Sequence, residues 1–202
     1  MEYIDLGLPS GTKWANMNIG AETETDYGLY FQWGDVIGYN GEDAKEHSYW
    51  HTCPANDGES KSNIGAMNKW YNANVTNRTL NPNVDAAYVH TKGEGRMPTL
   101  AQLTELFRET AHSYETINGV NCRKFINKKD PDKYILVPAG GFYGKGSKHK
   151  TNDDGCLWSR SPNDIGYAYS LEFSFDNNIG PMMDDSYFYA QNVRAVLIDG
   201  DK

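Results

Sequence analysis

The chain of 202 residues fits a single domain, and its hydrophobic content of 39% is enough for a modest core. Its formal net charge of −8 repels phosphate backbones, so we expect no nucleic-acid partner. No apolar stretch approaches the roughly 20 residues that cross a bilayer, and no basic and apolar leader opens the chain, so we expect neither membrane insertion nor a signal peptide.

Short strands and one long polar segment are predicted in the first half of the chain. The strands cover residues 2–6, 12–19 and 28–34. Residues 38–83 are polar, rich in Asn and Gly, and show no sustained period, which is typical of a long surface insertion. A short helix is predicted at 83–90.

The clearest helix is predicted to begin at Thr99. Thr99 and Gln102 form a capping box, in which each side chain accepts a hydrogen bond from a free backbone N–H of the first turn. The apolar residues that follow share one helical face, which predicts packing against a sheet. They are Leu100, Leu103, Leu106 and Phe107.

From residue 122 onward the pattern predicts strands. They are expected at 122–126, 134–138, 156–159, 167–175 and 193–197. Within 167–175, the odd positions, such as Leu171 and Phe173, are expected to face the core. Ser170 and Glu172 are then expected to face solvent. The residues expected in the core are Trp158, Leu171, Phe173, Val193 and Ala195.

Two clusters have features of metal sites but lack complete ligand sets. His47, His51 and Cys53 have H-x3-H-x-C spacing, yet no fourth ligand is specified. The adjacent Pro54 also argues against a helix that would align the two histidines. The loop 152–155, Asn-Asp-Asp-Gly, offers oxygens for calcium but does not match the EF-hand pattern. We expect no metal and no cofactor, and both clusters stay open as alternatives.

The cysteines and serines give no catalytic pattern. Cys53, Cys122 and Cys156 are odd in number and show no C-x-x-C spacing, so buried free thiols are expected in place of a disulfide framework. A G-x-S-x-G nucleophile elbow is absent from the sequence. We therefore assign no catalytic residue and expect a protein that is not an enzyme.

The most informative stretch is 160–191. Asn, Asp, Ser and Tyr make up 15 of its 32 residues, and these residue types are typical of antibody binding surfaces. The composition predicts a ligand-binding surface, and an ordinary polar hairpin remains the alternative. The residues expected to cluster on one exposed surface are Arg160, Asn163, Asp164, Ser170, Glu172, Asp176, Asn178, Asp184, Ser186, Tyr187 and Tyr189.

Several segments, in their order along the chain, resemble one known family. They are Tyr3–Ala15, Gly28–Gly34, Arg96–Thr99, Leu136–Gly141, Leu157–Ser161 and Asn192–Arg194. Over nearly its whole length the chain thereby resembles the Fibrobacter succinogenes major paralogous domain family, which is common in gut Bacteroidetes and their phages. The resemblance implies a single α+β domain over residues 1–202 with a C-type lectin-like fold. Such a fold has small, mostly antiparallel sheets, two helices and long irregular loops.

The resemblance also implies a function. The same fold occurs in the variable proteins of diversity-generating retroelements, where mutagenesis at adenines converts Asn codons into Tyr, Ser or Asp codons, in line with the composition of 160–191. It implies a display protein of a phage virion or a cell surface that binds a protein or glycan on a bacterial cell. The resemblance leaves the oligomeric state open. Lectin motifs of the Glu-Pro-Asn kind are absent, so calcium-dependent sugar binding is not expected.

The alternative implied by the resemblance is a formylglycine-generating-enzyme-like oxidase that uses Cys122 or Cys156. These two cysteines lie far apart in the sequence and in unrelated contexts. The Arg-Gly-Gly-Ser-Trp type of motif found in that enzyme group is also missing. Both departures weaken the enzymatic hypothesis.

Overall fold

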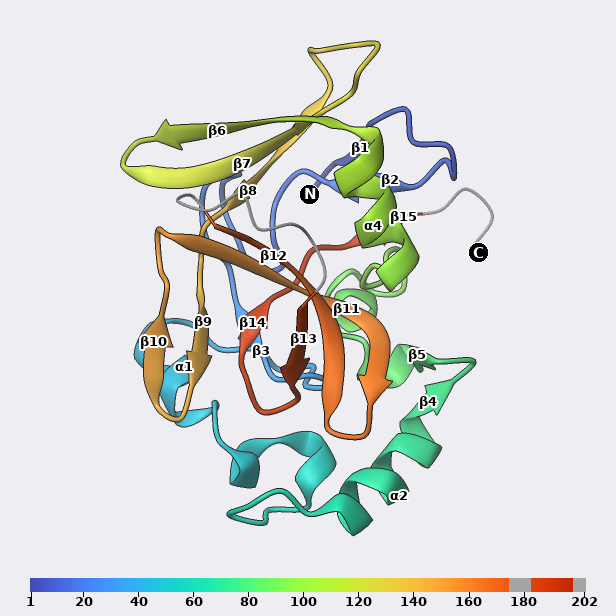
Figure 1. Cartoon of the computed structure of the whole chain (residues 1–202), viewed down its shortest axis with the longest axis vertical. Coiled ribbons are helices and arrows are strands. Elements are labelled where there is room, and N and C mark those ends of the chain that lie inside the picture. The colour runs from blue at the N-terminus through green and yellow to red at the C-terminus, as the bar shows by residue number, and fades with distance from the viewer. Residues whose placement is uncertain (175–182, 198–202) are drawn as a thin grey trace.

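The computed structural model describes residues 1–174 and 183–197 (Figure 1). These residues form a mixed α+β fold of several small, mostly antiparallel sheets, with two helices of seven or more residues and several short helical turns. The expected α+β class is confirmed at this level. In the part of the chain that the structure describes, no helix is both long and apolar enough to cross a membrane.

A five-stranded sheet lies at the centre of the molecule, in the order β13-β12-β11-β14-β3. Its strands are β3 (Tyr30–Phe31), β11 (Asp154–Asp164), β12 (Tyr167–Ser174), β13 (Met183–Ser186) and β14 (Gln191–Asn192). β11 and β12 form a long antiparallel hairpin, whereas β14 runs parallel to β11. The register of the hairpin shifts between Trp158 and Asp164, so side chains near its turn do not continue the alternation of its inner part.

A second sheet joins the first and the last described strands. It contains β1 (Tyr3–Asp5), β2 (Lys13–Ala15) and β15 (Val196–Leu197), and β15 pairs antiparallel with β2. The buried guanidinium of Arg194 donates hydrogen bonds to Asn18 Oδ1 at 2.9 Å and to the Ala15 carbonyl at 3.3 Å. These contacts tie the segment before β15 to the region that follows β2.

The predicted helix α4 (Leu100–Glu109) is present, with Thr99 as its N-cap. Thr99 Oγ1 accepts a hydrogen bond from the Gln102 backbone N–H at 3.2 Å, and Gln102 Oε1 accepts one from the Thr99 N–H at 2.8 Å. Leu103 and Leu106 are fully buried on one face of the helix. The capping box and the apolar face are therefore both confirmed.

A three-stranded antiparallel sheet follows α4 in the chain. It contains β6 (Ala111–Ile117), β7 (Val120–Ile126) and β8 (Tyr134–Pro138). The sequence pattern misses β6, because most of its side chains are at least partly exposed and show no alternation. Asn118 and Gly119 both have positive φ, 52° and 81°, and make the tight turn into β7.

Several smaller elements complete the described structure. They are α1 (Gly41–Glu46), α3 (Ala86–His90), the hairpins β4–β5 (Val75–Thr76 and Thr79–Leu80) and β9–β10 (Phe142–Gly144 and Ser147–His149), and 3-10 turns at Trp50–Thr52, Pro54–Asn56 and Pro82–Val84. The short helix expected at 83–90 corresponds to α3.

The expectation of an irregular insertion at 38–83 is wrong for its second half. An 11-residue helix, α2 (Ile64–Asn74), begins after Asn63, whose Oδ1 accepts a hydrogen bond from the Ala66 N–H at 3.1 Å. Met67 alone is fully buried in this helix, so its apolar period is too weak to stand out in the sequence. Figure 1 shows α2 below the turn of the β11–β12 hairpin, where Met67 packs beside Gly166.

Two hydrophobic clusters pack against the central sheet. Trp158 and Ala168 belong to one cluster, whereas Leu171 and Phe173 belong to the other. One cluster thus covers one face of β12 near the hairpin turn, and the other covers the opposite face along the inner part of the strand. All residues expected in the core are fully buried, namely Trp158, Leu171, Phe173, Val193 and Ala195.

Candidate functional site

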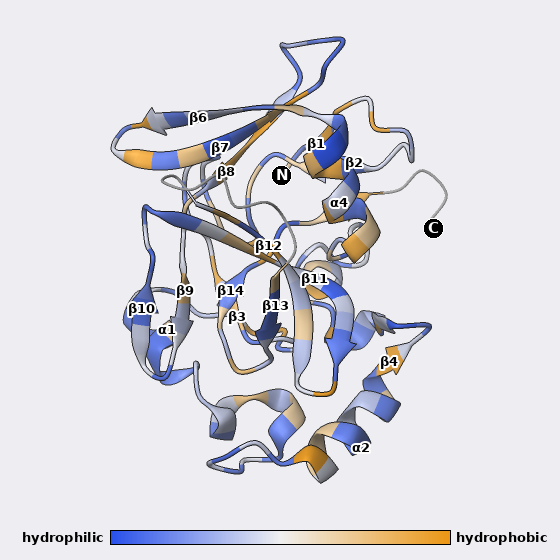
Figure 2. Ribbon diagram, viewed as in Figure 1, coloured by the Kyte–Doolittle hydropathy of each residue, from blue (hydrophilic) through white to orange (hydrophobic). Residues whose placement is uncertain are grey.

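Aromatic and polar side chains share one face of the β12–β13 pair near the hairpin turn. Tyr167 pairs with Ser186, and Tyr169 pairs with Asp184, so the members of each pair project from the same face of the sheet. Asn163 joins them from β11. We call these five residues the hairpin face. Figure 2 shows β13 as a mostly hydrophilic strand.

Hydrogen bonds fix the polar groups of the hairpin face. The Tyr169 hydroxyl donates to Asn163 Oδ1 at 2.7 Å, and Asn163 Nδ2 donates to Asp184 Oδ2 at 2.9 Å. This chain of bonds links three strands and orients a phenol, an amide and a carboxylate before any ligand arrives. These side chains are already ordered in the free protein, so a ligand that binds here loses less free energy to their immobilisation.

The Tyr167 ring is the large apolar group of the hairpin face. Its residue is 44% exposed, which places it among the most exposed large hydrophobic residues of the described chain. A tyrosine ring provides a large contact area with few torsions to immobilise. An exposed ring beside hydrogen-bonded polar groups is therefore suited to contact with a macromolecule.

The opposite face of β12 carries a different group, which we call the carboxylate cluster: Asp154, Glu172 and Asp185. Ser170 Oγ donates a hydrogen bond to Asp185 Oδ2 at 2.9 Å, and Gln191 donates to the same oxygen. Burial, and then Asp185 and Asp154, raise the pKa of Glu172 above its usual range. Burial also raises the pKa of Asp185, although its hydrogen bonds oppose the shift.

The carboxylate cluster contains more acceptors than donors. The buried atoms Asp154 Oδ1 and Gln191 Oε1 have no hydrogen-bond donor among the described residues. Lys150 is the nearby cation, with its Nζ 3.8 Å from Asp154 Oδ2. An arrangement of this kind favours the protonated form of a carboxyl group and so raises its pKa.

The structure does not place the predicted site residues on one exposed surface, so that prediction is wrong. Asn163, Asp164 and Asp184 are exposed and Ser186 is half-buried, all near the hairpin turn. Glu172 lies on the other face of β12, and Ser170 is fully buried beside Asp185. The error has a simple cause: a hydrophobic cluster that includes Trp158 and Ala168 covers the even-numbered face of β12 near the turn, so position 170 does not face solvent. Asp176 and Asn178 lie outside the described residues.

Tyr187 also departs from the prediction, because it is fully buried. Its ring stacks on Trp33 with a centroid distance of 4.3 Å, and its hydroxyl donates to the Asp164 carbonyl at 3.2 Å. Tyr187 follows the end of β13, and its side chain enters the aromatic core under the hairpin turn. Its burial excludes it from a displayed surface.

Tyr189 and Arg160 occupy other places. Tyr189 is half-buried and packs against Phe142 with ring centroids 5.1 Å apart. Arg160 is half-buried, and its backbone N–H donates to the Pro98 carbonyl at 2.8 Å, beside the start of α4. Neither belongs to the hairpin face.

Tyr167 and Tyr169 were not among the predicted site residues, yet they lie on the hairpin face. The alternation of 167–175 assigns them to the face of Leu171 and Phe173, and this assignment holds. The hydrophobic cluster under that face, however, does not reach the hairpin turn, where the register of β11 shifts. No sequence pattern locates the end of the cluster.

Residues of both clusters that were considered as alternative metal sites have structural contacts. The His47 ring stacks on Tyr39, and Asn152 donates to the Gly119 carbonyl and accepts from the Asn121 N–H. Among residues 1–174 and 183–197, no three His, Cys, Asp or Glu side chains lie close enough together to hold a metal ion.

The three cysteines are free and buried. Burial raises the pKa of the Cys53 thiol to about 12 and that of the Cys122 thiol to about 11. Burial likewise raises the pKa of Cys156 well above its usual range. At neutral pH all three are thiols, which are poor nucleophiles.

Comparison with known proteins gives no match to a protein-family model, a curated protein or a solved structure. Functional inference for this chain therefore depends on its own geometry and chemistry.

Proposed function

We propose that this protein is a ligand-binding display module with a C-type lectin-like fold, and that its hairpin face binds a protein or glycan on a bacterial cell. The mixed α+β architecture, the small antiparallel sheets and the two longer helices agree with the fold that the family resemblance implies. A phage virion or a bacterial surface is the setting that we propose for it.

The observation that carries this proposal is the exposed Tyr167 ring beside an ordered polar network. A side chain that is 44% exposed contributes little to packing, so folding alone does not require an aromatic ring there. The bonds from Tyr169 to Asn163 and from Asn163 to Asp184 hold the surrounding groups in place. Aromatic anchors with ordered polar neighbours supply most of the binding energy in protein interfaces.

The composition of the hairpin face also agrees with a retroelement variable protein. Its members are Asn, Tyr, Asp and Ser, the amino acids reached from Asn codons by mutation at adenines. We propose that the hairpin face belongs to the variable region, within the predicted range 160–191. A reverse-transcriptase gene beside an adenine-rich copy of the 3′ end would support this origin, and a coding region without either would count against it.

The oxidase alternative has less support. Catalysis by Cys122 or Cys156 requires an accessible thiolate, but both side chains are buried and burial raises the pKa of each thiol. We therefore propose a binding role and no enzymatic one.

Binding of the labelled protein to intact gut bacteria, measured by flow cytometry, tests the proposal. Tyr167→Ala should weaken binding to a responsive strain by about tenfold or more, because loss of an anchor at an interface costs about 2 kcal/mol. Tyr88→Ala is the matched control, since Tyr88 is 36% exposed on α3 and is not part of the hairpin face. Equal binding by wild type and Tyr167→Ala would contradict the role of the hairpin face.

A further inference from the structure

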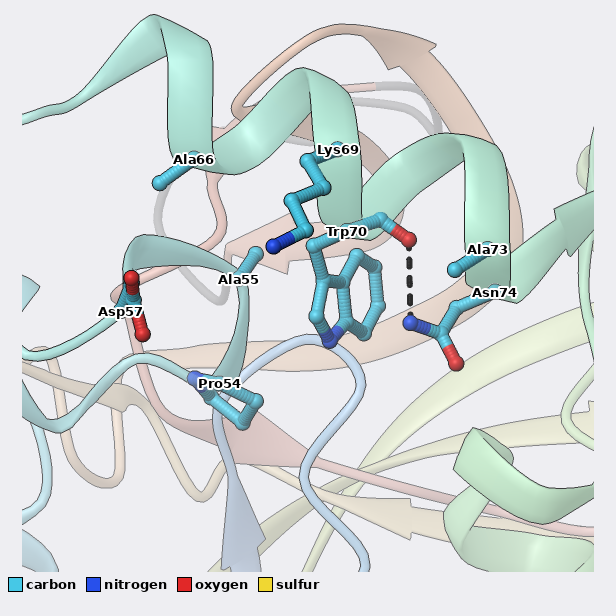
Figure 3. Close-up of a pocket in the computed structure, with 8 residues that line it drawn as sticks. All are labelled: Pro54, Ala55, Asp57, Ala66, Lys69, Trp70, Ala73 and Asn74. Carbon is cyan, nitrogen blue, oxygen red and sulfur yellow. Dashed lines mark hydrogen bonds between the residues drawn. The ribbon is translucent and has the colours of Figure 1, made fainter.

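A pocket of about 270 Å³ lies between α2 and the 3-10 turn at Pro54–Asn56. Figure 3 shows Trp70 descending from α2 into this pocket, with Lys69 and Asp57 on one side of the indole and Asn74 on the other. Its volume is slightly below the range of small-molecule sites, which usually occupy about 300 to 1,000 Å³. The pocket therefore suits a ligand of about one six-membered ring.

The walls of the pocket combine a flat aromatic group with small apolar side chains. The Trp70 indole also packs against the core: the ring centroids of Trp33 and Trp70 are 5.9 Å apart, and Gly34 leaves room for the indole to pack closely. Ala66 and Ala73 line the pocket from the helix. Trp70 is thus a rigid platform, and the two alanines keep the space beside it open.

Three polar side chains surround the platform. Asn74 Nδ2 donates to the Trp70 carbonyl at 2.9 Å, which leaves the side-chain oxygen of Asn74 as an acceptor. Within the described part of the chain, neither Lys69 Nζ nor the Asp57 carboxylate forms an ion pair or hydrogen bond. The pocket thus presents a donor cation, an acceptor anion and a neutral acceptor.

The two opposite charges of the pocket disfavour a ligand that carries a single charge. An anion that approaches Lys69 also meets Asp57, and a cation that approaches Asp57 meets Lys69. A neutral group that both donates and accepts hydrogen bonds satisfies all three polar side chains, and hydroxyl groups do so. A ring with hydroxyl groups on its rim and an apolar C–H face packs its face on the indole.

We infer that this pocket binds one neutral sugar ring without a metal ion. No residue of the hairpin face lines the pocket, so the inference does not depend on the proposed function. Few contacts are available to a ligand of this size, so the Kd expected for a free methyl glycoside is on the order of 1 mM.

Titration with methyl glycosides of glucose, galactose, mannose and N-acetylglucosamine, followed by tryptophan fluorescence and ligand-observed NMR, tests this inference. At least one glycoside should bind saturably. Ala73→Phe fills the pocket and should weaken binding at least tenfold. Asn72→Phe is the matched control, because Asn72 is exposed on the same helix outside the pocket, and it should bind as wild type does.

Two further variants make the outcome specific. Lys69→Met removes a donor and should weaken binding by about tenfold, because a hydrogen bond from a charged group is lost. Tyr167→Ala should bind the glycoside as wild type does, so that failure of the hairpin face and failure of the pocket are distinguishable. The inference is overturned if no glycoside binds, if Ala73→Phe leaves binding unchanged, or if a nucleoside or an amino acid binds more tightly than every glycoside.

Discussion

Two tyrosines near the same hairpin turn have opposite roles. Tyr187 is fully buried and stacks on Trp33, whereas Tyr167 is 44% exposed. Tyr187→Ala should lower the free energy of unfolding by about 3 to 5 kcal/mol, as expected for the loss of a buried aromatic ring. Tyr167→Ala should change it by less than about 0.5 kcal/mol. Urea unfolding of both variants measures the difference, and equal destabilisation would refute the assigned positions.

A single carboxyl group gives a pH-dependent prediction. Burial raises the pKa of Glu172 in the folded protein above its unfolded value of 4.5. The protonated Glu172 side chain therefore stabilises the fold fully below pH 4.5, and this stabilisation is lost as the pH rises through the pKa of the folded state. Glu172→Gln removes the ionised form. At neutral pH the variant should therefore be more stable than wild type, and the gain should shrink as the pH falls toward 4.5. Chemical denaturation at several pH values measures this, and destabilisation at neutral pH would contradict it.

At the scale of the element, α4 was predictable because a local rule defines it. Thr99 and Gln102 complete the capping box within four residues, so no tertiary contact is needed to recognise the start of the helix. Thr99→Ala should lower the free energy of unfolding by about 1 kcal/mol. Thr99→Ser keeps the hydroxyl and should retain most of the stability. If thermal or urea unfolding shows no difference between Thr99→Ala and wild type, the cap is not stabilising.

Elements that depend on distant contacts were harder to predict. The sequence of α2 does not reveal the helix, because its stability depends on Met67 and Trp70 packing under a hairpin about a hundred positions away. The alternation of β12 correctly places Leu171 and Phe173 in the core. It fails for Ser170. Alternation assigns residues to two faces of a strand, but it does not show whether the face with the polar residues is exposed to solvent or packed against other residues.

At the scale of the whole molecule, the core was largely predictable and the surface was not. The expected core residues are buried because apolar side chains are most stable in the protein interior, away from water. The candidate site depends on where a hydrophobic cluster ends and on which strands pair, and both are set by tertiary structure. The composition of residues 160–191 therefore indicated the region of the site, but it could not indicate which residues in that region are exposed.

The burial of all cysteines predicts slow thiol chemistry in the native protein. Burial raises the pKa of Cys53 to about 12 and that of Cys122 to about 11, and Cys156 is also shifted upward. A thiol-specific reagent at neutral pH should therefore label none of them quickly, whereas the denatured chain should react at all three positions. Rapid labelling of Cys122 or Cys156 in the native protein would revive the oxidase alternative.

The central claim is that the hairpin face of the molecule is where its ligand binds. Hydrogen exchange measured by mass spectrometry, with and without a surface extract from a bacterial strain that the protein binds, tests this claim directly. Amide protection should increase in peptides that cover β12 and β13 and should stay unchanged in the β6–β7 hairpin, which belongs to another sheet. Protection confined to β6–β7, or to any surface that leaves β12 and β13 unchanged, would contradict the proposal.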